Sequence, residues 1–260
     1  KRDVHFILSF RIELADASHE QKLIDALPER DRKHIRIVDG TEPSYPTPLK
    51  ETLASRPVVV GAGCAGLFAA LTLAEAGLKP LLIERGDDAR RRTDTISVFL
   101  GGGALDPESN IQFGLGGAGT FSDGKLNTGT KNPSHRLILK TFVDAGAPRD
   151  ILWDAKPHVG SDILPAVVTN IAARIEKLGG SVRYRTKLVD IDLDRAGAVS
   201  GIRVTTAQPG AGGASPGLIR CDRLILACGH SARDVFELIK RREIELARKT
   251  FAMGVRIEHL

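Results

Sequence analysis

The clearest pattern of apolar positions along the chain lies between residues 57 and 86. Val58–Val60 form a short β-branched run that predicts a buried strand, and Leu81–Ile83 form a second such run. The residues between the runs begin with Gly-x-Gly-x-x-Gly and continue with the apolar spacing of a helix. Strand, glycine-rich turn, helix and strand in this order predict a parallel βαβ unit that binds a dinucleotide.

Each glycine of this turn has a separate physical task. Gly61 lets the chain turn sharply out of the first strand, Gly63 lets the backbone approach a pyrophosphate, and Gly66 lets the helix pack closely on the sheet. Cys64 and Ala65 begin the helix, where the first-turn amides and a helix dipole of about half a positive charge favour an anion. We therefore expect this turn to hold a diphosphate.

Glu84 ends the second strand, 18 residues after Gly66. A carboxylate at this place can accept hydrogen bonds from both hydroxyls of an adenosine ribose, and it repels a 2′-phosphate, which disfavours NADP. A glycine-rich turn alone has no such meaning, because glycine is common in turns. The acid, the helix and the two strands together favour the nucleotide interpretation over that simpler one.

The chain before this unit predicts a small α/β module. Apolar and polar residues alternate over 4–14, as in a half-buried antiparallel strand, and a short helix is expected near 18–27 with Ser18 as its N-cap. Residues 39–48 are rich in proline and polar residues and predict a linker. We therefore expect residues 1–50 to form a separate N-terminal module.

Helices and strands also follow the βαβ unit, and they include an inserted β-rich region. Asn132 is a candidate cap of the first helix, and residues 207–217 predict a turn or an insertion. A buried strand is expected to end at Gly229. The predicted elements are helices at 133–145 and 164–178 and strands at 181–184, 187–192, 199–205, 223–229 and 251–257.

These elements predict an α/β fold: a Rossmann-like, three-layer domain over residues 51–260, with the small module before it and the β-rich region inserted. The chain begins at a predicted strand without an initiator methionine and stops inside or just after another, and this last strand has no downstream partner in the sequence. We therefore expect the chain to be a piece of a longer protein, with a substrate domain beginning near residues 235–260.

Residues 97–130 contain an unusual number of glycines. A loop of this length in a compact domain is usually either functional or disordered. Apolar residues interrupt the glycines at Ile111, Phe113, Leu115 and Phe121, which is a poor fit to simple disorder. We expect the loop to contact a ligand, with a mobile loop as the alternative.

Composition narrows the classes of function. The longest apolar runs are far shorter than the 18 or so residues that a membrane span needs, and no signal peptide is visible. The three cysteines form no Cys-x-x-Cys, which favours a reducing, cytoplasmic location. The net charge is +5, but the basic residues are dispersed apart from Arg90–Arg92, which we interpret as solvated surface. Nucleic acid and membrane are therefore not expected partners.

Other candidate chemistry is weaker. Lys125 follows glycines but lacks the P-loop pattern, and His135, His158 and His230 have no metal-ligand spacing, so we expect no metal. Asp123 and Lys125 are expected to form either a charge pair near a ligand or an ion pair that closes the loop.

Beyond these local patterns, the chain resembles the flavin-dependent oxidoreductases of the glutathione-reductase-like superfamily, which have two dinucleotide-binding domains. Within it, the chain is similar to bacterial proteins described as uncharacterised FAD-dependent dehydrogenases. The matching stretches are Gly61–Gly66 with Glu84 and Arg85, Asn110–Leu126, Cys228–Asp234 and Gly254–His259. The resemblance covers nearly the whole chain, and the second and third of these stretches are more specific than the first.

The resemblance implies a role for each matching residue. The first glycine turn would hold the FAD pyrophosphate, Glu84 the adenosine ribose, and Arg85 would lie against the adenine. The strand around Leu188 would reach the adenine through main-chain hydrogen bonds, and Gly229 would close the strand that returns to the cofactor. The second glycine-rich segment would approach the pyrophosphate or the flavin through its backbone amides, those of Gly116, Gly117, Gly119 and Thr120 among them.

Two departures from the family pattern bear on function. Leu115 stands where an acidic residue is expected, and the chain lacks the later glycine-rich segment that closes the flavin site. The first hypothesis is an FAD-dependent oxidoreductase that acts on a small molecule, with NAD(P)H as a candidate electron donor. The alternatives are an NAD-binding dehydrogenase and a flavin-binding module without catalysis.

Overall fold

The computed structural model describes residues 9–10, 12–38, 42–50, 53–122, 124–126, 132–206, 216–250, 254–255 and 257. The chain forms two compact units, Lys1–Glu42 and Pro43–Leu260. None of the helices in the described part is long and apolar enough to cross a membrane.

The first unit contains a 3-10 turn, η1 (Ala17–His19), and two short helices, α1 (Glu20–Ala26) and α2 (Glu29–Arg32). Its helical start differs from the prediction, because Asp16 and not Ser18 is the cap: the Asp16 carboxylate accepts the Ser18 N–H at 2.9 Å. Of the strand predicted at 4–14, residues 4–8 and 11 lie outside the described residues, and the rest is not strand. Phe10 and Ile12 are largely exposed, so their alternation buries no face.

The second unit is built on a four-stranded parallel sheet in the order β3-β2-β1-β7. The two predicted strands are β1 (Val58–Val60) and β2 (Leu81–Ile83), and Val60 pairs with Ile83. The strand predicted at 181–184 was expected to belong to the inserted β-rich region. It is β3 (Ser181–Arg183), and it pairs with β2 in the parallel sheet. The strand expected to be buried, β7 (Leu224–Leu226), is only half-buried, because it forms an edge of this sheet.

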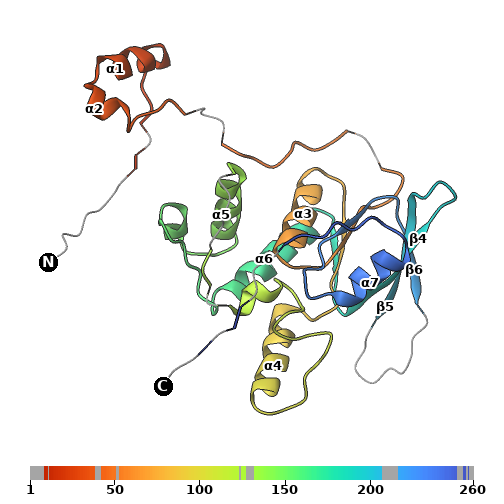
Figure 1. Ribbon diagram of the computed structural model, residues 1–260. Coiled ribbons are helices and arrows are strands. Elements are labelled where there is room, and N and C mark those ends of the chain that lie inside the picture. Colours follow the sequence, from red (N-terminus) through yellow and green to blue (C-terminus); the bar gives the residue numbers. More distant parts are fainter. Residues whose placement is uncertain are drawn as a thin grey trace. The chain divides into compact units, whose positions relative to one another are not determined.

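Alternate side chains of β1 and β2 enter two different cores. Val59 and Leu82 pack against α3 (Cys64–Glu75) and α6 (Leu164–Lys177). Val58 and Ile83 pack on the other face, against a three-stranded antiparallel sheet and α7 (Arg233–Arg241). Helices, parallel sheet and antiparallel sheet thus form three layers, so the α/β, Rossmann-like prediction is confirmed. Figure 1 labels α3 and α6 of the first layer and β4, β5 and β6 of the third.

The antiparallel sheet has the order β4-β5-β6. It consists of β4 (Thr186–Leu193), β5 (Val199–Thr206) and β6 (Gly217–Arg220). The first two strands agree closely with the prediction, whereas β6 was not predicted, and only its first residue, Gly217, belongs to the stretch predicted as a turn or an insertion. Residues 207–215 lie outside the described residues, as do most of 251–257, where Gly254, Val255 and Ile257 are not in a strand.

The remaining helices lie along the middle of the chain. The helix predicted at 133–145 is present as α5 (Ser134–Asp144), and the Asn132 side chain accepts the Ser134 N–H at 2.9 Å. A second helix, α4 (Ala89–Leu100), was not predicted; Asp88 caps it by accepting the N–H groups of Arg90 and Arg91, both at 3.0 Å. Two 3-10 turns complete the unit, η2 (Ala118–Phe121) and η3 (Arg149–Leu152).

Residues 39–48, the proline-rich stretch predicted as a linker, pack against the folded domain in their second half. The Tyr45 hydroxyl lies 2.8 Å from the Thr141 hydroxyl of α5, and the ring packs against the core beneath α3 and α6. The second compact unit accordingly begins at Pro43.

Candidate nucleotide site

A pocket of about 340 Å³ lies where β1, β2 and β7 end. In open parallel sheets, ligands bind beyond the carboxyl ends of the strands. The glycine loop before η2, the start of β4 and residues 227–231 complete its walls. The residues predicted from the sequence that line it are Gly61, Gly63, Cys64, Ala65, Glu84, Arg85, Gly116, Gly117, Gly119, Leu188 and Gly229.

The three glycines of the first turn have different surroundings. A Cβ at Gly66 would lie 1.7 Å from the Gly61 carbonyl oxygen, so Gly66 is required for helix packing and does not line the pocket. At Gly63, the nearest atom to such a Cβ is the Cα of Gly117, 3.8 Å away. Gly63 therefore presents bare main chain to the pocket, as its predicted role requires.

The two glycine-rich segments lie side by side. Gly63 and Gly116 form a parallel bridge, in which the Gly116 N–H donates to the Ala62 carbonyl at 2.8 Å. Cys64 and Ala65 open α3 at the same wall, and the first N–H groups of a helix have no partner within the helix. This wall therefore combines main chain stripped of side chains with amides and a helix dipole that attract an anion.

Glu84 is 4% exposed, and main-chain amides surround its carboxylate. Oε1 accepts the N–H groups of Gly86 and Gly114, each at 2.9 Å, and Oε2 accepts that of Ala62 at 2.7 Å. The sequence reasoning missed this role, in which one carboxylate joins both glycine-rich segments to the end of β2. A carboxylate has about four acceptor positions, so one remains for a ribose hydroxyl.

Thr120 lies behind the pocket wall rather than in it. The residue is 2% exposed, its hydroxyl has no hydrogen-bond partner in the described part of the chain, and it does not line the pocket. A Cβ on Gly116 would lie 1.9 Å from the Thr120 Oγ1. The Thr120 hydroxyl is therefore packed against Gly116 on the inner side of the pocket wall, and the predicted contact of this residue with the cofactor, which was through its backbone amide, stays a prediction.

Arg92 on α4 is fully buried beneath the second glycine-rich segment. Its guanidinium donates to the carbonyls of Asn110, Ile111 and Leu115, at 2.9, 2.9 and 2.8 Å, and more weakly to that of Gly114. Burial lowers the pKa of Arg92 to about 10, although the negative charge of Glu84 partly opposes that shift. The prediction that Arg90–Arg92 is solvated surface is therefore wrong for Arg92, which organises the loop.

Arg85 does not extend freely toward the pocket. It forms ion pairs with Glu108 at 2.7 Å and with Asp234 at 2.8 Å, and its guanidinium carbon lies 4.3 Å from the centre of the Phe113 ring. Lys187 contacts the same two carboxylates, at 2.7 and 3.0 Å. We call these residues, Arg85, Glu108, Lys187 and Asp234, the ionic quartet.

Leu188 and Gly229 border the pocket from the remaining sides. Leu188 is buried on β4, next to an irregularity in the pairing of β4 with β5. Gly229 has φ +75° and follows β7, together with Cys228. Loss of solvation by nearby protein atoms raises the thiol pKa of both Cys64 and Cys228, which does not favour a thiolate here.

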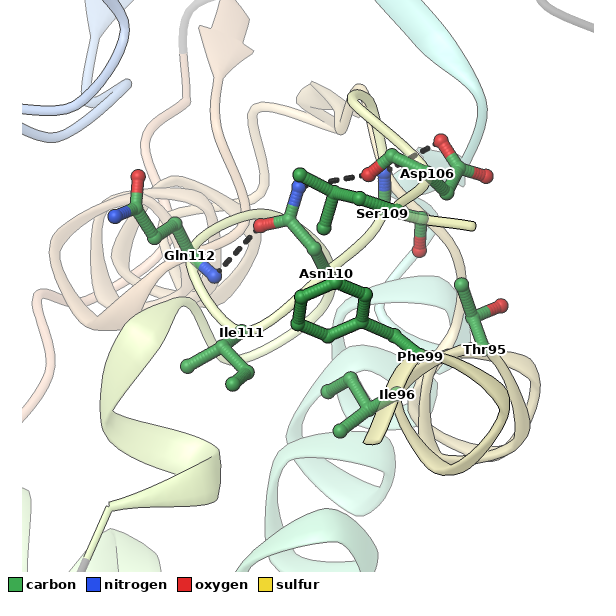
Figure 2. A pocket seen from close by; sticks show the side chains of 9 residues that line it. Thr95, Ile96, Phe99, Asp106, Ser109, Asn110, Ile111 and Gln112 are labelled. Carbon is green, nitrogen blue, oxygen red and sulfur yellow. Dashed lines mark hydrogen bonds between the residues drawn. The ribbon is translucent and has the colours of Figure 1, made fainter. Parts of the chain in front are cut away.

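A second pocket, of about 270 Å³, lies between α4 and residues 105–112 (Figure 2). Ile96, Phe99 and Ile111 give it apolar walls. Its polar side belongs largely to the loop's own hydrogen bonds, such as that from the Gln112 N–H to the Asn110 side chain at 2.9 Å. Gln112 lines both pockets.

Among the described residues, no group of three or more His, Cys, Asp or Glu side chains is arranged to hold a metal ion.

The sequence of residues 55–251 matches the model of the pyridine nucleotide-disulphide oxidoreductase family, Pyr_redox_2. The chain belongs to this family. The matched range includes the βαβ unit, both glycine-rich segments and all four residues of the quartet, so the pocket described above lies within it.

Two relatives and one solved structure illustrate the likeness. An uncharacterized protein of Clostridium beijerinckii is 46% identical over 209 residues, which cover 80% of this chain and 37% of that protein. A thiamine thiazole synthase of Aeropyrum pernix is 28% identical over 219 residues, 82% of this chain and 67% of that enzyme. The crystal structure of Thermovibrio ammonificans THI4 is 19% identical, with a TM-score of 0.47 over 74% of this chain and 64% of that one. The chain spans little more than a third of the Clostridium relative.

Proposed function

We propose that the chain is the FAD-binding part of an FAD-dependent oxidoreductase of the glutathione-reductase-like superfamily, acting on a small molecule. The observation that carries this proposal is the bridge between Gly63 and Gly116, which brings two glycine-rich segments to the start of α3. Membership of an oxidoreductase family supports it independently.

The proposal assigns the pyrophosphate to the wall formed by Gly63, Cys64, Ala65 and Gly116–Gly119. The residues present fit such a group. The space beside Gly63, where a side chain would begin, is open, and the first N–H groups of α3 have no acceptor within the helix. Glu84 holds that wall in place and retains one acceptor position for the ribose. A bound flavin would itself accept and donate the hydride.

The domain boundaries and the cellular location belong to the same proposal. Residues 51–260 would form the nucleotide domain, with the substrate domain beginning near 235–260, and residues 1–50 a separate module. A cytoplasmic location is supported by the cysteines, because Cys64, Cys221 and Cys228 are all free.

The test is a binding titration of the purified full chain with FAD, FMN and NAD⁺, followed by flavin fluorescence and by calorimetry. We expect FAD to bind and FMN, which lacks the adenosine half, to bind at least about tenfold more weakly. Folded protein that binds neither FAD nor NAD⁺ would contradict the assignment of the pocket. Binding of NAD⁺ without FAD would favour the dehydrogenase alternative, which the family description also makes a candidate.

Catalysis needs a second measurement. Protein loaded with FAD is mixed with NADH or NADPH and an artificial electron acceptor, and the bleaching of the flavin is followed. Reduction and reoxidation support an oxidoreductase, whereas a flavin that neither donor reduces favours the binding module.

A further inference from the structure

The ionic quartet lies at the edge of the pocket where the adenosine ribose is expected. Arg85 follows Glu84 at the end of β2, and both Arg85 and Lys187 line the pocket. In dinucleotide-binding folds, an arginine near this position receives the 2′-phosphate of NADP. Two cations here would therefore suit a ribose that carries an extra phosphate.

Two carboxylates occupy those cations. Glu108 and Asp234 each contact both Arg85 and Lys187, at 2.7 to 3.0 Å, so the quartet carries no net charge. Arg85 uses its Nε and both terminal nitrogens in these contacts, and one face of its guanidinium lies on Phe113. A phosphate at this edge would have to displace a carboxylate and would then remain beside it.

The quartet joins four separate parts of the fold. Arg85 lies two residues after β2, Lys187 is on β4, Asp234 is in the first turn of α7, and Glu108 belongs to the loop before the second glycine-rich segment. That loop is fixed as well, because Asp106 accepts the Glu108 N–H at 2.8 Å and pairs with Arg185 at 2.8 Å. Displacing the Glu108 carboxylate would therefore disturb these contacts as well as its own ion pairs.

Glu84 is less suited to exclude a phosphate than its position suggests. Its charge is shared among three main-chain amides, which are directed at it from 2.7 to 2.9 Å. The carboxylate keeps its negative charge, but three of its roughly four acceptor positions are already used by these amides. Neighbouring groups therefore also decide whether a 2′-phosphate fits at this edge.

From this geometry we infer that the ionic quartet is a specificity filter, in which Glu108 and Asp234 neutralise Arg85 and Lys187 so that the pocket accepts adenosine nucleotides without a 2′-phosphate and rejects those that carry one. This inference rests on the proposed nucleotide site, and it names which nucleotides that site takes.

The first test uses the unaltered protein with two probes, 5′-AMP and adenosine 2′,5′-bisphosphate, which differ only in the 2′-phosphate, in calorimetric titrations at low salt. We expect 5′-AMP to bind at least about tenfold more tightly, the effect of one unfavourable charged contact. Equal or tighter binding of adenosine 2′,5′-bisphosphate would overturn the inference without any variant.

The second test frees the cations with Glu108→Gln and Asp234→Asn, singly and together. Each variant should bind adenosine 2′,5′-bisphosphate about tenfold more tightly than the unaltered protein, while its affinity for 5′-AMP changes less than about threefold. Adding Lys187→Met to the double variant should remove most of the gain. Folded variants that still bind 5′-AMP but show no gain would refute the filter.

Asp192→Asn is the matched control. Asp192 forms an ion pair with Arg203 at 3.0 Å on the antiparallel sheet and does not line the pocket, so it makes the same change in net charge elsewhere. A gain in this control equal to that of Asp234→Asn would show that total charge, not the quartet, decides the result. FAD is titrated in parallel: if FAD fails to bind but the two adenosine probes behave as described, the flavin proposal fails and the filter stands.

Discussion

The carboxylate of Glu84 accepts the main-chain N–H of Gly114 at 2.9 Å, across 30 residues of sequence. Through this bond and those from Ala62 and Gly86, the acid at the end of β2 fixes the two glycine-rich segments against each other. The residue expected to recognise a ribose is thus first a support for the wall that a pyrophosphate would contact.

Glu84→Gln should therefore affect folding as well as binding. The glutamine amide would direct its own N–H groups at one or two main-chain donors, and each buried group left without a partner costs about 1–3 kcal/mol. We expect the free energy of unfolding in urea to fall by about that amount, together with weaker FAD binding. Glu237→Gln, at an exposed position of α7, is the control and should change neither. Full stability in the Glu84 variant would contradict the supporting role.

The first glycine turn offers a test that separates packing from binding. Gly66→Ala places a methyl group 1.7 Å from a carbonyl oxygen, so we expect a severe loss of stability, about 3 kcal/mol or more by comparison with other overpacked sites. Gly63→Ala has space on the protein side and should fold nearly normally. Its methyl group lies where the pyrophosphate is proposed, so FAD affinity should fall at least about tenfold. A Gly63→Ala protein with unchanged affinity would place the pyrophosphate elsewhere.

Adjacent arginines on α4 give a matched pair. Arg92→Lys keeps a positive charge but cannot reach three carbonyls at once, since an ammonium lacks the planar fork of a guanidinium. We expect lower thermal stability and faster proteolysis within residues 101–122. Arg91→Lys should have no effect, because the Arg91 side chain is 76% exposed. Equal proteolysis of both variants would show that Arg92 does not organise the loop.

The pKa of Asp234 indicates how the ionic quartet responds to acid. Burial opposes its ionisation, but hydrogen bonds from Arg85 and Lys187 outweigh that effect and lower its pKa to about 2. A carboxylate whose pKa is lowered on folding stabilises the protein above its usual pKa, and this contribution is lost as the pH falls from about 4 toward 2. Urea unfolding midpoints of the unaltered protein should drop through that window. In Asp234→Asn the drop should be smaller, whereas Asp94→Asn, at an exposed position on α4, should follow the unaltered protein.

The βαβ unit could be predicted because its signals are local. Apolar runs, glycine spacing and a terminal acid lie within 30 residues, and the structure places them as expected. The strand β3 was assigned to the wrong sheet because its partner, β2, is about 100 residues earlier, and no local pattern identifies that partner. The helix α4 was missed because its sequence is mostly polar and its buried face is narrow.

The candidate site divides in the same way. Its glycines were found from motif spacing, whereas the ionic quartet draws single residues from four distant segments. The sequence gives no sign that Arg92 is buried, since an arginine under a loop and one in solvent look identical in a list of residues. For Thr120 the family resemblance implied only a main-chain contact, and it gave no sign that the turn η2 directs the side chain into the interior.

The central strand β1 has only three residues, and they are divided between the two cores, with Val59 on one side and Val58 and Val60 on the other. Neither core can be completed while this strand is out of place. We therefore expect the helical layer and the antiparallel layer to unfold in one transition. A destabilising substitution in either core should then also affect the nucleotide turn, which begins at the end of the same strand.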